Sequence, residues 1–554
     1  MLTIRSWTDG PPGIGSLTRG FTRRLRRVGR QALVPDTSIT RVHVVVFPTD
    51  PIQEGFGPSE VTVASIERAG RPLMSVDVSV HPPPVHLLTI DPGVLWLFVL
   101  DGAALEPHAL STLVEIFDAN PGLDMAYGDA AAIFVDTATD PQVDVASAGP
   151  WLLPGFSPDR LAEQFYLGHL VAFRPHRHVA VAGGDEPGPG PWGDVDGPWS
   201  AAALARTVAH VPQPLHRPAP AIGFWEPERS GTSEWRPQSE LSAADLPLVS
   251  VVIPTNGSTR DLDRGPVRLV DQAVRSVLSS HYPHIEIVVV LTPGSPHDLA
   301  PCLQELVGAR NDAGRTITLV TDDRPFNFSN ACNRGAVRST GEVLVFLNDD
   351  TEVIAPDWLV HLVRHARNPE IGPVGARLRY EDGRVQHSGI WSRGGHPTHR
   401  YEGWPGDAEG YLGALRVTQN CLAVTGACIA VERTKFDLVG GFSPVFPNSY
   451  NDVDLCLKLW ERGLRTVVEP RAELFHFEAS TRDPSITDDD LAALHDRWRW
   501  RLNHDPFDNP NHTAERSEEW PLPTATGCPS ILGSQVARFW PLDPVGGSAT
   551  IDRR

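Results

Sequence analysis

Residues 342–352 read EVLVFLNDDTE, a short apolar run that ends abruptly in Asn348, Asp349 and Asp350. Apolar runs rich in β-branched and aromatic residues predict a buried strand, so these three side chains are expected just past its carboxyl end. Ligands of open α/β sheets bind at that edge. Two adjacent carboxylates repel each other, and a divalent cation with oxygen ligands relieves the repulsion. The structural alternative is an Asx-type turn that closes the strand.

Comparable apolar runs occur on both sides of this stretch, with helical spacing between them. Strands that alternate with helices predict an α/β fold with a mainly parallel sheet covered on both faces. The runs expected to form strands are residues 41–48, 94–100, 248–254, 285–290 and 316–320.

The deciding stretch has a counterpart in the first half of the chain. LFVLDGAALEPHALSTLVEIFDANPG, which begins at Leu97, parallels LVFLNDDTEVIAPDWLVHLVRHARNP, which begins at Leu344. Two further segments repeat in the same order, which predicts an internal repeat of one strand–loop–helix module. The counterpart loop has alanines at Ala103 and Ala104, so a cation held by the second copy has no matching site in the first.

Composition divides the chain into five parts. Residues 1–35 form a basic arm, in which seven arginines stand against one acid before residue 34. A first α/β domain over 36–216, a linker over 217–247 and a second α/β domain over 248–515 follow, and a tail covers 516–554. The arm fits either a basic amphipathic helix at an anionic membrane surface or a solvated segment.

The overall charge and hydropathy exclude several classes of protein. The 554 residues carry a net charge of -20, whereas a nucleic-acid binder needs a basic face, so no nucleic-acid partner is expected. The longest apolar runs fall short of the roughly 18–20 residues that span a bilayer, and the start MLTIRSWTDG lacks an apolar signal region. Six scattered cysteines indicate thiols in a reducing compartment. We expect a cytoplasmic protein, with peripheral contact at the inner face of the cell membrane through the arm.

A second acidic cluster precedes a predicted helix in NDVDLCLKLWERG, residues 451–463. Asp452 and Asp454 lie at its start, where carboxylates cap helices and interact favourably with the helix dipole. One carboxylate suffices for a cap, so the other can serve as a general base. His476 ends the apolar run AELFH and could add a nitrogen ligand to the same cation.

Between residue 246 and about 515 the chain contains, in this order, the segments VSVVIPT, DDRPFNFSNACNRGA, GEVLVFLNDDTEV, VTGACIAVER, LVGGFSPVF, YNDVDLCLKLWERG, AELFHFEAS and DPFDNPN. With these segments the chain resembles the family 2 nucleotide-sugar glycosyltransferases of the GT-A fold. The likeness is greatest to the bacterial branch, related to rhamnosyltransferases, that builds surface polysaccharides. The first half resembles a degenerate copy of the same domain.

The resemblance implies a role for each matching residue. Asp350, with Asp349 beside it, falls at the metal and diphosphate site, and His476 completes the metal coordination. Asp452 falls at the catalytic base, with Asp454 as its acidic neighbour near the acceptor. The positions that contact the nucleotide are Thr255, Asn256, Asp323, Asn333 and Asp349. The chain departs from the family after the run 285–290, where Leu291 and Thr292 replace an aspartate that reads the base.

The implied reaction is transfer of a hexosyl or deoxyhexosyl group, with inversion, from a nucleotide-diphosphate sugar to a glycan or lipid-linked saccharide. The implied cofactor is Mn²⁺ or Mg²⁺. The aromatic residues of 391–404 could stack on acceptor sugars or pack locally. Two other classes compete: a non-catalytic scaffold of a polysaccharide assembly complex, and a nucleotidyltransferase. The latter usually needs a glycine-rich phosphate loop after the first strand, and VVIPTNGSTR is a poor one.

Overall fold

The computed structural model describes a large part of both halves of the chain. The predicted basic arm, most of the linker and most of the tail lie outside the described residues. The described residues are 39, 41–47, 59–70, 75–79, 93–130, 153–161, 167–174, 205, 207–217, 246–262, 265–293, 304, 307, 315–477, 487–509 and 535–538. No helix among them is long and apolar enough to cross a bilayer.

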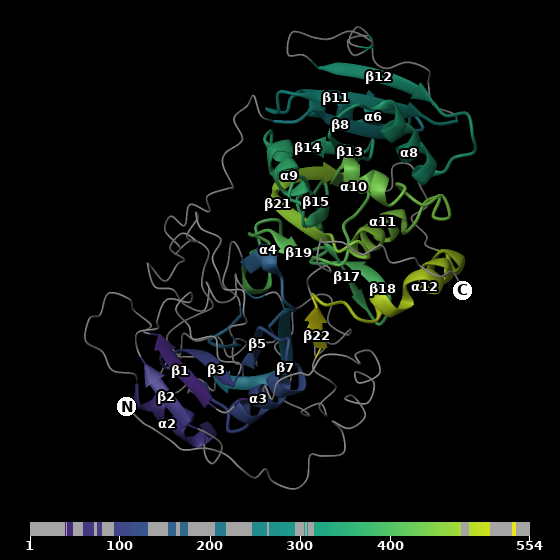
Figure 1. The fold of residues 1–554 in the computed structure, drawn as a ribbon. Coiled ribbons are helices and arrows are strands. Elements are labelled where there is room, and N and C mark those ends of the chain that lie inside the picture. The colour runs from purple at the N-terminus through teal and green to yellow at the C-terminus, as the bar shows by residue number, and fades with distance from the viewer. Residues whose placement is uncertain are drawn as a thin grey trace.

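The second half is built on a ten-stranded sheet (Figure 1). Its strand order is β12-β11-β8-β13-β20-β15-β21-β14, with β16 and β19 attached to β15 and β21. The bounds are β8 Val249–Thr255, β11 Ile285–Leu291, β12 Thr316–Thr321, β13 Val343–Leu347, β14 Thr351–Val353, β15 Ile371–Arg379, β16 Val385–His387, β19 Gln419–Asn420, β20 Cys428–Glu432 and β21 Arg465–His476. The first four strands of this order pair in parallel, whereas β20 is antiparallel to both of its neighbours. The predicted α/β fold is confirmed, and the antiparallel insertion of β20 was not predicted.

Helices cover both faces of this sheet because successive strand residues point to opposite sides. In β13, Val345 packs into one core and Phe346 into the other. The first core includes α6 (Leu269–Leu278) and α9 (Trp358–Ala366). The second includes α8 (Phe328–Arg338), α10 (Arg433–Leu438), α11 (Asn451–Trp460) and α12 (Asp488–Leu502). Small two-stranded sheets form from β9 (Thr259–Leu262) with β10 (Gly265–Arg268), and from β17 (Ile390–Arg393) with β18 (His396–His399).

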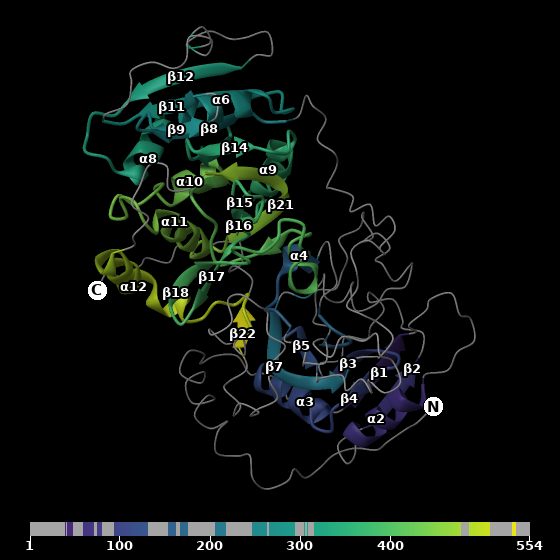
Figure 2. The same ribbon diagram turned by 180° about the vertical axis from the view of Figure 1, so that it is seen from behind.

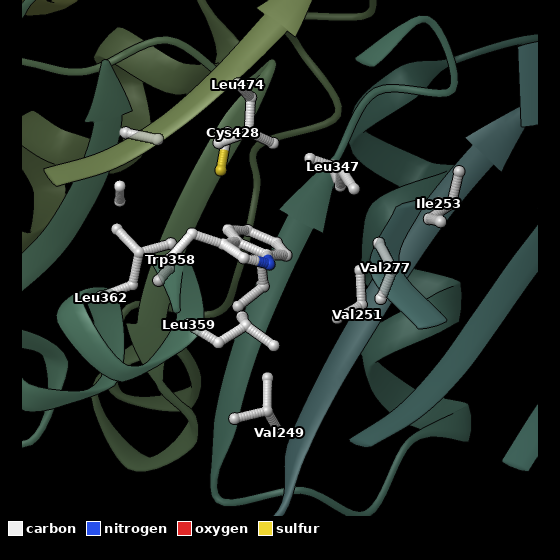
Figure 3. Close-up of a cluster of buried hydrophobic side chains, with 14 of the residues drawn as sticks. Val249, Val251, Ile253, Val277, Leu347, Trp358, Leu359, Leu362, Cys428 and Leu474 are labelled. Carbon is white, nitrogen blue, oxygen red and sulfur yellow. The ribbon is translucent and has the colours of Figure 1, made fainter. Parts of the chain in front are cut away.

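Trp358 anchors the first of these cores. Its indole lies among Leu359, Leu362, Cys428 and Leu474, between the helix and the strands (Figure 3). The indole nitrogen donates to Ser280 Oγ over 2.8 Å, so the buried N–H has its hydrogen bond. This packing holds α9 against β15, β20 and β21.

The first half contains a smaller sheet with the order β2-β1-β3-β6-β5-β7-β22, and β4 pairs with β7 (Figures 1 and 2). The bounds are β1 Arg41–Phe47, β2 Ser75–Ser79, β3 Val94–Leu100, β4 Ala104–Leu105, β5 Met125–Ala130, β6 Leu170–Phe173, β7 Thr207–Arg217 and β22 Gln535–Arg538. Helices α2 (Glu60–Gly70) and α3 (Ala109–Ala119) pack on one face.

The two sheets have the same topology. The order β2-β1-β3-β6-β5-β7-β4 corresponds strand for strand to β11-β8-β13-β20-β15-β21-β14. Each pair is parallel or antiparallel in the same places in both sheets. The agreement supports the predicted internal repeat.

A segment of the first half is embedded in the second. Helix α4 (Pro158–Leu161) leaves the smaller sheet and lies against the larger one beside β19 (Figures 1 and 2). Asp159 accepts hydrogen bonds from Arg465 Nε at 2.9 Å and from Asn420 Nδ2 at 2.7 Å. Burial alone raises the pKa of Asp159, but Arg465 and Asn420 together hold it below its ordinary value. The two halves are therefore joined by a buried ion pair.

The carboxyl end of the chain returns to the first half. Asn509 Nδ2 donates to Asp129 Oδ1 over 2.9 Å, and Gly155 N–H donates to the carbonyl of Phe507 over 3.2 Å. Strand β22, in the tail where no structure was predicted, pairs antiparallel with β7. Both ends of the chain thus contribute to the smaller sheet.

Candidate active site

The carboxyl ends of neighbouring strands meet at one edge of the larger sheet. Thr255, the last residue of β8, accepts at its carbonyl from both the N–H and the hydroxyl of Thr292, each over 2.9 Å. The Thr255 hydroxyl donates to Asp349 Oδ2 over 2.6 Å. The first sequence-predicted pair, Thr255 and Asp349, is therefore in contact.

Asp350 and His476 lie close together in the fold, although they are 126 positions apart in the chain. Strand β14 pairs antiparallel with β21 and places Thr351 opposite His476. As a result His476 Nε2 lies 3.2 Å from Asp350 Oδ1 and 3.3 Å from Asn348 Nδ2. The backbone on both sides is tied as well, since Phe477 N–H donates to the carbonyl of Asp350 over 2.9 Å.

Gln386 sets the orientation of this imidazole. Its Oε1 lies 2.8 Å from His476 Nδ1 and accepts a hydrogen bond there, so Nε2 is the nitrogen that faces Asp350 Oδ1 and Asn348 Nδ2. An imidazole whose second nitrogen is held by an acceptor is the usual arrangement of a metal-ligating histidine.

These donors fit part of a hard divalent cation's coordination shell. Asp350 Oδ1 and His476 Nε2 face each other, and Asn348 Oδ1 is buried with no hydrogen-bond partner among the described residues. No group of three or more His, Cys, Asp and Glu side chains in the described part of the chain is gathered tightly enough to hold an ion alone. Asp349 is turned to Thr255 instead. Mg²⁺ and similar ions commonly take one or two carboxylates from the protein and complete their shell with substrate phosphate and water.

Asp452 reaches the same region through a tight turn. Gly426 N–H donates to Asp452 Oδ2 over 2.8 Å, and the next residue, Ala427, accepts at its carbonyl from Asn348 N–H over 3.0 Å. A side chain at Gly426 would meet Asp452 Cβ at 3.5 Å, so the turn lies directly against the start of α11. The carboxylate is half-buried and each of its oxygens keeps a lone pair for another donor.

Asp454 does not occupy the predicted place near an acceptor. Residues two apart on a helix point to nearly opposite sides. Asp454 is fully buried, accepts from Trp498 Nε1 over 2.9 Å, and lies 3.1 Å from Arg497 Nη1. It joins α11 to α12, which makes it a structural carboxylate.

The other predicted nucleotide contacts divide into two groups. Asn333 is committed to the backbone: its Nδ2 donates to the Phe442 carbonyl over 2.8 Å and its Oδ1 accepts from Phe442 N–H over 2.9 Å. These two hydrogen bonds use one N–H and one lone pair of the amide, and its role as a nucleotide contact stays a prediction. Asn256 and Asp323 are exposed at the ends of β8 and β12, on the edge where Thr255 lies.

Residues 250–437 match the model of glycosyl transferase family 2. The match begins in β8, includes the aspartates after β13 and ends before Asp452 and His476. Over these residues the chain is similar to family 2 glycosyltransferases. The strand order and this match together establish its GT-A fold.

Two curated relatives extend the comparison. "Uncharacterized protein y4gI" of Sinorhizobium fredii (strain NBRC 101917 / NGR234) is 36% identical over 282 residues, which is 49% of this chain and 30% of that protein. "O-antigen biosynthesis protein RfbC" of Myxococcus xanthus is 29% identical over 457 residues, 76% of this chain and 33% of that protein. The chain spans about a third of the length of these relatives. The second alignment is longer than everything after residue 247, so it reaches into the first half.

Two solved structures of glycosyltransferases are also similar. One is GalNAc-T7 with UDP, GalNAc and Mn²⁺, with a TM-score of 0.35 and 18% identity over 46% of this chain and 48% of the other. The second is the mannosyltransferase PcManGT from Pyrobaculum calidifontis with GDP-Man and Mn²⁺, with a TM-score of 0.30 and 19% identity over 42% and 58%. These scores are too low to carry an argument about this chain.

Three further residues, Gln386, Gly426 and Asp322, contact or neighbour the predicted site residues and were not predicted from the sequence. Gln386 orients His476 from 90 residues away, and Gly426 holds Asp452 through its backbone. Asp322 is buried at the end of β12, where hydrogen bonds from Arg324 lower its pKa. Asp322 was within reach of sequence reasoning, because it precedes the predicted Asp323 at a strand end. The other two act through pairings between distant segments.

The aromatic residues of 391–404 pack locally. The ring of Trp391 lies 3.9 Å from the Arg393 guanidinium and 5.1 Å from that of Arg400. Tyr401 is buried and meets Trp404 edge to face. These local contacts support the packing alternative, and stacking on an acceptor sugar stays a prediction.

Proposed function

We propose that this chain is a metal-dependent glycosyltransferase that moves a sugar from a nucleotide-diphosphate donor to a hydroxyl of a surface glycan or lipid-linked saccharide. The observation that carries the proposal is the convergence of Asp350 and His476 at 3.2 Å. Asp452 accepts from Gly426 N–H, and the neighbouring Ala427 carbonyl accepts from Asn348 N–H, which supports a place for Asp452 near the same strand end.

Asp452 is the proposed base. A sugar hydroxyl has a high pKa, so its proton must be removed as its oxygen forms the new bond to the donor's anomeric carbon. The two backbone N–H groups that contact Asp452, from Gly426 and Val453, fix the carboxylate at 2.8 Å each. Attack from the face opposite the diphosphate inverts the anomeric centre, the stereochemistry that the family resemblance implies.

Asp350, His476 and Asn348 would hold the cation. A bound Mn²⁺ or Mg²⁺ stabilises the negative charge that collects on a departing diphosphate. Gln386 keeps His476 Nε2 facing Asp350, and Thr255 keeps Asp349 beside the loop. Asn256, Asp323, Asp322 and Thr255 line the strand ends where the nucleotide would lie.

The biological context is proposed from the Myxococcus relative, whose name places it in O-antigen biosynthesis. By that likeness the acceptor is a growing surface polysaccharide and the sugar a hexose or deoxyhexose. The protein would work in the cytoplasm, with its basic arm at the inner face of the membrane. The first half would be a non-catalytic GT-A copy that supports the second through α4.

A donor screen tests the proposal. The full chain is heated with Mn²⁺ and each of a panel of UDP-, dTDP-, GDP- and CDP-sugars, and the true donor should raise the melting temperature, because a ligand that binds the native state stabilises it. The best donor is then assayed for transfer and for metal-dependent hydrolysis. If no nucleotide sugar binds or reacts in the presence of Mn²⁺, the result would reject the proposed activity in favour of the non-catalytic scaffold.

A further inference from the structure

The turn after β12 carries an arginine whose orientation is fixed by a buried carboxylate. Asp322 directly follows β12, and its N–H donates to the carbonyl of Leu291, the last residue of β11, over 2.9 Å. The Asp322 side chain is only 6% exposed. It accepts from Arg324 Nε over 2.7 Å and from Arg324 Nη2 over 2.6 Å. Two hydrogen bonds along one side of the guanidinium thus fix its plane beside the ends of β11 and β12.

The other side of this guanidinium is available to a ligand. The contacts with Asp322 use Nε and one N–H of Nη2, and the Arg324 side chain makes no further hydrogen bond or ion pair with the residues that the structure describes. Both N–H groups of Nη1 and the second one of Nη2 are therefore left for a ligand. The Arg324 side chain is 52% exposed, so these donors can be reached from solution.

The distance from the proposed cation site decides which part of the donor lies at this turn. Strands β12, β11, β8 and β13 lie side by side in this order and pair in parallel, so they end at one edge of the sheet (Figure 1). Neighbouring strands are about 4.8 Å apart, which puts the end of β12 roughly 14 Å from the end of β13. A diphosphate on a cation at Asp350 is out of reach of Arg324, whereas the base at the other end of the nucleotide extends across the strand ends towards it.

We propose that Arg324 recognises the base of the donor nucleotide through an edge with two adjacent hydrogen-bond acceptors. The inference rests on the proposed function and deepens it, because it names the class of nucleotide. Guanine presents such an edge at O6 and N7, where arginine commonly binds it, and cytosine presents one at O2 and N3. Uracil and thymine have an N–H between their two carbonyl groups, and adenine has an amino group beside N7, so these bases offer no such pair.

The base preference of nucleotide binding tests the proposal. GDP, CDP, UDP, dTDP and ADP are titrated calorimetrically against the full chain with Mn²⁺. Either GDP or CDP should bind at least about tenfold more tightly than UDP, dTDP and ADP, the size expected for a bidentate contact with a base, and the tighter of the two identifies the base. Arg324→Gln should lose this preference, because it weakens binding of the preferred diphosphate and leaves the affinities of UDP, dTDP and ADP unchanged.

Two further variants separate base recognition from a general effect of charge. Arg338 is exposed at the opposite end of α8, close to the start of β13. Arg338→Gln removes the same charge as Arg324→Gln and should keep the wild-type preference. Arg324→Lys keeps the charge without the planar fork and should retain only part of the preference.

Two results would overturn the assignment: wild type that binds UDP, dTDP or ADP as tightly as the better of GDP and CDP, or an unchanged preference in Arg324→Gln. Because the preference is a ratio measured within one protein, a loss of stability in the variant does not change it. If wild type binds none of the five diphosphates with Mn²⁺, the proposed function itself fails, and the role of Arg324 with it.

Discussion

The two halves have the same sheet topology, but they differ in the residues that follow equivalent strands. After β13 the loop carries Asn348, Asp349 and Asp350, whereas after β3 it carries Asp101, Gly102 and Ala103. Ala103 is fully buried. Opposite the strand that follows, β21 places His476 at the register position where β7 places Arg217.

The first-half loop is also occupied by its own contacts. Asp101 Oδ1 accepts from Ser59 N–H over 2.8 Å, and Thr62 donates to the Ala103 carbonyl over 3.0 Å. The acid in the first half therefore supports the start of α2, whereas the acids of the second half face a histidine and a threonine. The apolar residues of the strands thus specify the sheet, whereas a few side chains at the strand ends specify the chemistry.

Removal of the proposed base should have the largest effect on the chemistry that distinguishes the second half from the first. Asp452→Asn should lower transfer about 10²–10⁴-fold, because a carboxamide cannot accept the acceptor's proton, while donor binding stays near wild type. Initial transfer rates and donor calorimetry measure the two quantities. Asp454→Asn is the matched control, and should lower the melting temperature by weakening the contact with Arg497 and Trp498. Wild-type transfer by Asp452→Asn would reject the base assignment.

The junction between the halves should give the next largest effect. Asp159→Ala leaves Arg465 buried without its main partner and should cost about 3–5 kcal/mol of unfolding free energy. Denaturant unfolding of wild type, Asp159→Ala, Arg465→Ala and the double variant measures the coupling. Because the folded pKa of Asp159 is lowered, its contribution is present above its unfolded pKa and is lost as pH falls through the folded value. Identical acid-unfolding profiles for wild type and Asp159→Ala would contradict this ion-pair role.

The metal ligand in the second half should give a smaller but selective effect. Asp350→Ala should weaken the apparent affinity for Mn²⁺ by about tenfold or more, since even residues that support metal ligands are worth about 10–100-fold. Titration of Mn²⁺ in the presence of the best donor measures it. An unchanged Mn²⁺ dependence would remove Asp350 from the site.

The equivalent substitution in the first half should have the smallest effect. Asp101→Ala removes one charged hydrogen bond to Ser59 and should cost about 1–2 kcal/mol of stability. Mn²⁺ titration and transfer should match wild type. A loss of Mn²⁺-dependent donor binding would instead give the first half a share of the chemistry.

The strands that were predicted, β1, β3, β8, β11, β12 and β13, are short apolar runs with local signals. The predicted run 285–290 became β11 (Ile285–Leu291), and 94–100 became β3 without change. The position of β20 between β13 and β15 could not be predicted, because antiparallel pairing depends on partners far apart in sequence. The position of α4 against the larger sheet depends on buried polar contacts, which no periodic sequence pattern predicts.

The site was predictable in part for the same reason. Asp349 and Asp350 follow a strand directly, so their place at the sheet edge follows from strand direction. Asp452 and Asp454 look equivalent in sequence, and only the packing of α12 against α11 shows that Asp454 points inward. Asn333 is a polar residue on a helix whose amide is used by the backbone of Phe442, 109 residues later.

Strand β21 connects the junction to the site along one rigid element. Its first residue, Arg465, is held by Asp159 of the first half, and its last, His476, faces Asp350. Strand β21 pairs with β15 on both sides of an irregularity, from Arg465 to Glu469 and from Glu473 to Phe475. Because Arg465 and His476 are the two ends of the same strand, a change in the position of Asp159 in the first half would act on the strand whose last residue faces Asp350.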